Sequence, residues 1–170
     1  MAERFNIDNT RFVYKTNFSG DPERDRFADK RRKCNILIPD PEQVKDLIKM
    51  GVKIRQTTPT SNDDPDTFVP DSFVTAVVAY RNKYNEPLEY LPKVYLVVHG
   101  RPPRLLSEET ISELDFIRVK NVNVILNARE YDPVNHLKSL YIRTMYVEQD
   151  VEDDPYASLY AGYDEEEDSF

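Results

Sequence analysis

Several stretches of the chain alternate apolar and polar residues, which is the pattern of a β-strand that buries one face. The longest is residues 117–129, with Val122, Val124 and Leu126 on one face and asparagines on the other. The other predicted strands are residues 10–18, 34–38, 52–58, 72–80, 93–99 and 138–147. Because these strands come in runs and do not alternate with helices, a parallel Rossmann-type sheet is disfavoured and a mostly β protein is predicted.

Two short helices are predicted between the strands. Residues 42–50 place apolar side chains at helical spacing, and Asp40 before Pro41 suits the helix start. Gly51 stands where a C-cap belongs. Residues 107–115 begin with a serine that can cap a second helix. This set of elements fits a small antiparallel barrel or sandwich with two short helices. The OB-fold is a barrel of this kind, and it binds oligonucleotides on one open face.

The end of the chain has a different composition from the rest. Residues 150–170 hold nine acidic residues, no lysine or arginine, and a terminal Phe170. Such a block of like charge is predicted to be a disordered acidic tail. The whole chain has 31 acidic and 23 basic residues, so residues 1–149 keep 22 acids against all 23 bases and are near neutral. Residues 1–9 are predicted to be a flexible N-terminus, which leaves residues 10–149 as one folded domain.

The composition argues against several classes of protein. A single cysteine, Cys34, excludes an internal disulfide and fits a reducing compartment. The two histidines are not spaced as a metal site, and no run is long and apolar enough to span a membrane. Neither a phosphate-binding glycine loop nor a serine-nucleophile motif is present. We therefore expect a cytoplasmic protein that is not an enzyme and has no cofactor or metal.

Basic residues gather in the predicted hairpin of residues 19–33, which ends in four consecutive bases. Each base can displace a counterion from a phosphate, although a solvated loop with internal ion pairs is the alternative. The candidate phosphate contacts are Arg24, Lys30, Arg31, Arg32, Lys33, Arg55, Arg81, Lys83, Arg101, Arg104 and Arg143.

Aromatic residues accompany these bases along the chain and could stack on the bases of a nucleic acid. The candidates are Tyr14, Phe27, Tyr80, Tyr84, Tyr95, Tyr141 and Tyr146, and for any single one a place in the core is about as common. Tyr141 is the strongest, because alternation along the last strand places it on the face of Arg143. The same alternation places Met145 on that face and Tyr146 on the opposite one.

In this organisation the chain resembles phage-type single-stranded DNA-binding proteins of the OB-fold kind. The ending, with Asp164, Glu165, Glu166, Glu167, Asp168 and the terminal Phe170, is similar to the tails of bacterial single-stranded DNA-binding proteins and of the bacteriophage T7 class. Residues 16–20, 94–98 and 141–147 also resemble the phage branch. The long linker and Pro-Phe tip of the bacterial housekeeping form are missing, so the resemblance implies a homodimer at most.

The resemblance implies sequence-independent binding and protection of single-stranded DNA in phage DNA replication, recombination and repair. The tail would compete with DNA for the binding groove and, once displaced, recruit a polymerase, primase-helicase or recombinase. One alternative is a non-enzymatic interaction or assembly module with a solubilising tail. Another is a nuclease that holds a metal on Asp63, Asp64 and Asp66.

Overall fold

The structure is a computed structural model that describes residues 3–24 and 31–150. Its elements, in chain order, are β1 (Glu3–Thr10), the 3-10 helix η1 (Pro22–Arg24), β2 (Arg32–Leu37), helix α1 (Pro41–Met50), β3 (Arg55–Gln56), β4 (Ser72–Val78), β5 (Lys93–Val97), β6 (Arg104–Leu106), the 3-10 helix η2 (Ile111–Phe116), β7 (Val119–Asp132) and β8 (Leu137–Gln149). The prediction of a mostly β protein is confirmed. Within the described ranges, no helix combines the length and the apolar character needed to cross a membrane.

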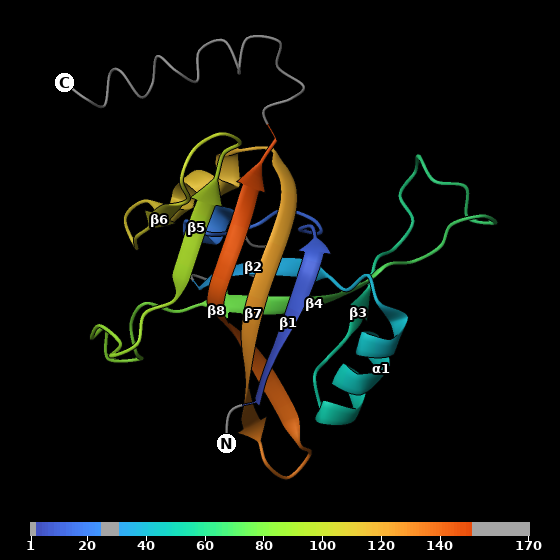
Figure 1. The fold of residues 1–170 in the computed structure, drawn as a ribbon. Helices are drawn as coiled ribbons and strands as arrows, with labels where there is room; N and C mark the ends of the chain where they lie inside the picture. Colours follow the sequence, from blue (N-terminus) through green and yellow to red (C-terminus); the bar gives the residue numbers. More distant parts are fainter. Residues whose placement is uncertain (1–2, 25–30, 151–170) are drawn as a thin grey trace.

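The strands form one eight-stranded sheet, and β7 and β8 are its central antiparallel pair. β1 pairs with the far side of β7, while the far side of β8 pairs first with β4 and then with β5. β2 and β3 pair with β4, and β6 pairs with β5. In Figure 1, β1, β7, β8 and β5 stand side by side and β2 and β4 cross behind them. The sheet thus folds over itself into two layers.

The core lies between these two layers. Val124 of β7 is opposite Met145 of β8, and both side chains are buried. Ile36 of β2 and Val74 of β4 are buried against them from the second layer. Burial of each such side chain contributes about 1.5–3 kcal/mol. The alternate residues of β7 and β8 consequently point away from the core, onto the outer face of the first layer.

The sheet is not the closed antiparallel OB-fold-like barrel that the sequence predicts. In the part of the chain that the structure describes, no ladder joins β1 to β2, and β8 runs parallel to both β4 and β5. The chain after β1 does run along the free edge of β2, through isolated bridges from Phe12 to Ile36 and from Asn17 to Lys33. Alternation shows which side of a strand is buried but not the direction of its neighbours, so the parallel pairs could not be predicted from it.

The first strand lies earlier in the chain than predicted. The sequence predicts a flexible terminus over residues 1–9 and a strand over residues 10–18, whereas Glu3–Thr10 is the strand. Phe5 and Ile7 of this strand pair with β7 and face the core. Two apolar residues among polar ones gave too weak an alternation to recognise, and pairing with the long β7 stabilises the strand.

Helix α1 is confirmed together with its caps. The Asp40 carboxylate accepts a hydrogen bond from the backbone N–H of Glu42 at 3.0 Å. Gly51 has a φ of 92°, and a Cβ at this position would lie 1.8 Å from the carbonyl oxygen of His136. Only glycine therefore allows the helix to end against the turn between β7 and β8. The helix predicted over residues 107–115 is the shorter 3-10 helix η2.

A β-bulge in β8 reverses the predicted alternation of its upper half. The register between β7 and β8 shifts after Ile125, and Arg143 is the extra residue on β8. Before the bulge, Tyr141 is half-buried and lies outside the core, as predicted. After it, Met145 is buried and Tyr146 is 41% exposed, the reverse of the prediction. The bulge thus moves a tyrosine onto the outer face.

Candidate nucleic-acid interface

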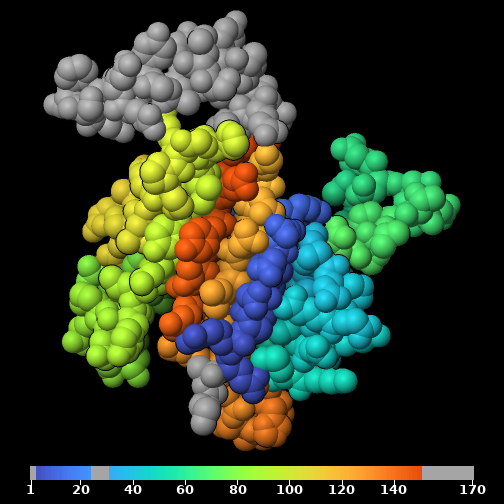
Figure 2. Space-filling model, viewed as in Figure 1, coloured from blue at the N-terminus to red at the C-terminus, as the bar shows by residue number. Residues whose placement is uncertain are grey.

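The outer face of β1, β7, β8 and β5 carries two stacked tyrosine rings. Tyr95 of β5 and Tyr146 of β8 are partners in the parallel ladder, and their ring centroids lie 4.8 Å apart at an interplanar angle of 11°. Since Tyr95 is on the β5 side, the other face of the Tyr146 ring is turned towards β7. Figure 2 looks onto this outer face, where the four strands lie side by side. Tyr95 therefore packs against one face of the Tyr146 ring and holds that ring in place on the outer face of the sheet.

A hollow of about 380 Å³ adjoins Tyr146 and extends across β7 to β1. Its apolar surface includes Ile125, which pairs with Thr144 on the same face of the sheet. The polar side chains around it are Arg4, Asn6, Asp8, Asn123 and Thr144. One aromatic wall, an apolar base and a polar rim are the features that hold a planar, partly polar ring such as a nucleobase.

Three cations border this outer face. Arg4 donates from Nε to Asn127 Oδ1 at 3.4 Å, Arg143 is exposed at the bulge, and Lys93 is exposed beside β8. Among the described residues none of the three is in an ion pair with a carboxylate. Their charges are therefore available to neutralise phosphates, together with the exposed Arg129, whose guanidinium lies 5.2 Å from the Tyr141 ring centroid.

Three predicted binding residues, Arg32, Tyr80 and Arg81, contact one another or Glu108 within the protein. Together with Glu108 we call them the Glu108 cluster. Arg81 donates from Nε to both carboxylate oxygens of Glu108 at 3.1 Å. Arg32 donates to the Glu108 backbone carbonyl at 3.3 Å, and its guanidinium lies 5.8 Å from the Tyr80 ring centroid. Tyr80 is only 7% exposed, and burial raises its pKa to about 12. Tyr80 is thus part of the core and offers no ring to a ligand.

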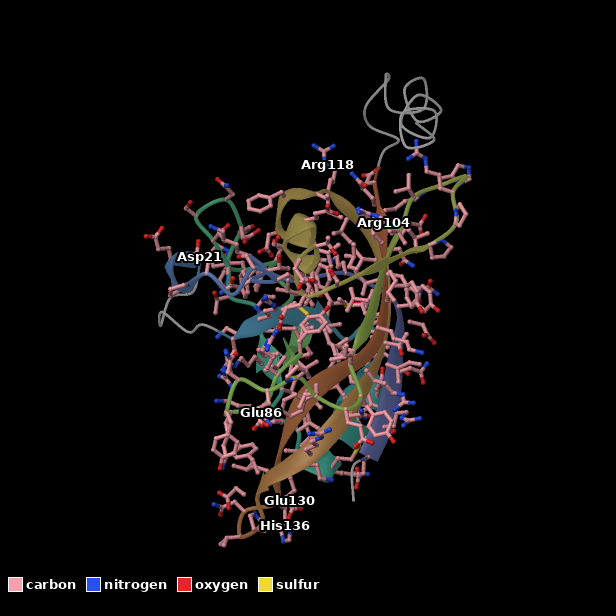
Figure 3. All side chains as sticks on the ribbon, turned by 90° about the vertical axis from the view of Figure 1, so that its left-hand side faces the viewer. Asp21, Glu86, Arg104, Arg118, Glu130 and His136 are labelled. Carbon is pink, nitrogen blue, oxygen red and sulfur yellow. The ribbon has the colours of Figure 1, made fainter. Side chains whose placement is uncertain are left out.

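The remaining predicted cations are spread over the molecule. Arg104 pairs with Glu113, and Arg101 is half-buried in the turn between β5 and β6. Arg104 lies near one end of the molecule and His136 at the tip of the β7–β8 hairpin at the other (Figure 3). Arg55 is exposed on the short β3. These cations do not form one continuous basic groove.

Two further aromatic residues from the predicted set, Tyr84 and Tyr14, are exposed outside the hollow. Tyr84 is 70% exposed in the loop between β4 and β5, with the Lys83 ammonium 5.1 Å from its ring centroid. Tyr14 is 56% exposed, packs edge-on against Phe73, and its hydroxyl accepts a hydrogen bond from the Thr58 backbone N–H at 3.2 Å. The loop that carries Tyr84 leads into β5, which is one of the four strands of the outer face.

Part of the predicted hairpin and the predicted tail after Asp150 lie outside the described residues. This applies to Phe27, Lys30, the acidic residues 164–168 and Phe170, and Arg24 is described only for its backbone. Of the four consecutive bases that end the hairpin, Arg31 is exposed, whereas Arg32 and Lys33 are half-buried.

Cys34, Asp63 and Asp64, which the sequence offers as possible catalytic or metal-binding residues, have structural roles. Burial, and next the nearby Asp115 carboxylate, raise the pKa of the Cys34 thiol, which keeps it protonated and unreactive. Asp63 accepts hydrogen bonds from the backbone and side chain of Thr60, and Asp64 accepts from the Asp66 backbone, as turn residues do. Among the described residues, no group of three or more histidine, cysteine or acidic side chains is arranged to hold a metal.

Sequence reasoning missed the β1 side of this interface. Arg4, Asn6 and Asp8 alternate with the core residues of β1 and so share the outer face. They were overlooked because residues 1–9 were assigned to a flexible terminus. The alternation from Phe5 to Ile7 was the one available signal, and the partner strand that makes it meaningful is more than a hundred residues away in the chain.

A sheet face with stacked aromatic rings and scattered cations is a surface of the class that binds single-stranded nucleic acids. Residues 1–168 match the family model described as "Putative phage ssDNA-binding domain", and the chain belongs to this family. The resemblance to phage single-stranded DNA-binding proteins is thereby confirmed at the level of the family. No curated protein and no solved structure matches the chain.

Proposed function

We propose that the chain binds single-stranded DNA across the outer face of β1, β7, β8 and β5. The observation that carries this proposal is the Tyr95–Tyr146 stack beside the 380 Å³ hollow, with the cations around it that have no carboxylate partner among the described residues. Membership of the family supports the choice of DNA as the ligand. A duplex keeps its bases stacked inside, so only a single strand can use a protruding ring in this way.

In this proposal one base enters the hollow and stacks on the free face of Tyr146. Stacking of a base on an aromatic side chain contributes about 1–3 kcal/mol and depends little on sequence. Arg4, Arg143 and Lys93 contact the phosphates on either side, and Lys83 with Tyr84 can extend the contact along the loop before β5. The protein binds and protects single strands during phage replication and recombination, without catalysing a reaction.

The acidic tail is proposed to act as a competitor for the same surface. An acidic segment that contains an aromatic ring matches two features of the outer face, the stacked tyrosines and the cations that have no carboxylate partner among the described residues. Deleting residues 164–170 should tighten binding of single-stranded DNA by severalfold at low salt, with a smaller effect at high salt. Equal or weaker binding of the shortened chain at low salt would show that the tail does not compete. In the full proposal the displaced tail recruits replication proteins.

The first experiment is fluorescence anisotropy with a labelled oligo-dT and a duplex of equal length, at several salt concentrations. We expect binding of the single strand that weakens steeply with salt, and little binding of the duplex. Both the full chain and the chain without residues 164–170 are measured, so that self-competition cannot hide binding. If neither binds oligo-dT at low salt, the proposed function is wrong.

A further inference from the structure

The hollow beside Tyr146 contains one group that a simple phosphate-binding surface would exclude, the carboxylate of Asp8. A carboxylate near the path of DNA repels phosphates. Its presence is favourable only where it meets a part of the nucleotide that donates hydrogen bonds. The Watson–Crick edge of a base is such a part, and that edge points away from the backbone when the base enters a pocket.

Asp8 is held in position but not neutralised. The side-chain amide of Asn6 donates to Asp8 Oδ2 at 2.9 Å, and both residues line the hollow. Asp8 is exposed, and within the described residues its Oδ1 has no hydrogen bond and no cation forms an ion pair with it. Arg4, the nearest cation on β1, is turned to Asn127. One carboxylate oxygen is therefore left to accept from a ligand.

We propose that the hollow prefers a base whose Watson–Crick edge carries an amino group, and that Asp8 is the residue that selects it. Cytosine presents its N4 amino group as a donor, and pairing of an acidic side chain with this group is an established form of base readout. Thymine presents the O4 carbonyl at the equivalent position, and two acceptors facing one another repel. This inference rests on the proposed function and deepens it, because it adds a base preference at one position of an otherwise sequence-tolerant surface.

The comparison of cytosine with thymine is the sharpest test, because both are pyrimidines on the same backbone and differ mainly in that edge. Anisotropy is measured with oligo-dC and oligo-dT of equal length, at mildly alkaline pH, where cytosine is uncharged. The two affinities are taken for the wild type and for Asp8→Asn. The ratio of the two affinities is the quantity of interest, since loss of a negative charge alone strengthens binding of both oligonucleotides.

We expect the preference for oligo-dC over oligo-dT to fall about threefold to tenfold in Asp8→Asn, which is the range that one hydrogen bond provides. The asparagine amide can donate as well as accept, so it no longer discriminates. Asp8→Ala, which has no acceptor, should give the same loss. Asp66→Asn is the matched control: it removes one charge from the loop before β4, away from the hollow, and should leave the ratio unchanged.

An unchanged ratio in both Asp8 variants, with tight binding of both oligonucleotides, overturns this inference and leaves the proposed function standing. A fall of the ratio in the Asp66→Asn control as large as that in Asp8→Asn also overturns it, because net charge would then be the cause. Failure of both the full chain and the chain without residues 164–170 to bind either oligonucleotide overturns the proposed function and the inference together. Thermal unfolding of each variant shows whether it is folded in the assay.

Discussion

The outer face and the Glu108 cluster contain the same kinds of residue but differ in whether those residues are exposed and whether their charges are paired. Each combines tyrosine with arginine, and each contains residues that the sequence singled out for DNA binding. In the Glu108 cluster the Tyr80 ring is buried and Arg81 is paired with a carboxylate. On the outer face Tyr146 is 41% exposed, and Arg143 has no carboxylate partner among the described residues.

The difference shows that residue type alone does not define a binding surface. A cation already bound to a carboxylate must lose that partner before it can bind a phosphate, so little free energy is gained. A ring inside the core cannot stack on a base without unfolding the protein. The surroundings of each residue, which the fold determines, distinguish a structural cluster from a candidate binding site. This contrast can be tested by changing the equivalent residue in each region.

The largest effect is expected from the tyrosine of the outer face. Tyr146→Ala should weaken binding of single-stranded DNA by about 1–3 kcal/mol, or roughly 5-fold to 150-fold, because it removes the stacking surface and opens the hollow. Tyr146→Phe keeps the ring and should bind nearly as the wild type does. Anisotropy with oligo-dT measures both.

Tyr84→Ala is a useful companion variant, since Tyr84 is more exposed than Tyr146 but no tyrosine among the described residues stacks on it. We expect a smaller loss than for Tyr146→Ala. If Tyr146→Ala binds as the wild type does while Tyr84→Ala loses most of the affinity, the DNA contacts the loop before β5 and the assignment of the outer face is wrong.

A medium effect is expected from the arginines. Arg143→Ala should weaken binding severalfold and reduce the magnitude of the salt slope by about 0.7, the value for one phosphate contact on a single strand. Arg81→Ala should leave the salt slope nearly unchanged, because its charge is already balanced by Glu108. The slope is obtained from anisotropy titrations at several salt concentrations. The opposite ranking of the two variants would place the DNA at the Glu108 cluster.

Much of this fold could be predicted from the sequence, and the failures have physical causes. The alternation along β7 and the caps of α1 depend on local patterns, so residues such as Val124 and Asp40 were assigned correctly. Whether the sheet closes, and whether neighbouring strands run parallel or antiparallel, depends on which strands pair with one another. The alternation of apolar and polar residues carries no information about that pairing. β6 is not among the predicted strands, because three residues are too few to show a period.

The site was harder to predict than the fold. Tyr95 and Tyr146 were both named as candidates from their residue type, but their stacking requires the parallel pairing of β5 with β8. The bulge at Arg143 depends on the register with β7, so strict alternation assigned Tyr146 to the wrong face. Asp8 and Arg4 became visible only once β1 was placed beside β7. Each miss concerns a contact between segments far apart in the chain.

The smallest effect is expected from Tyr80, and it concerns stability and not binding. Its hydroxyl is buried without a hydrogen-bond partner among the described residues, so Tyr80→Phe should change the free energy of unfolding by less than about 1 kcal/mol at neutral pH. Burial raises the pKa of Tyr80 to about 12 in the folded chain, against about 10 for an unfolded tyrosine. From pH 10 upward the unfolded state therefore loses this proton first, and the wild type loses stability relative to Tyr80→Phe as the pH rises to 12.

Denaturant unfolding of both proteins over this range measures the difference, while DNA binding at neutral pH should be equal. Parallel stability curves for the two proteins would mean that Tyr80 ionises as freely as an exposed tyrosine, and the contrast between the buried ring of the Glu108 cluster and the exposed ring of Tyr146 would then fail.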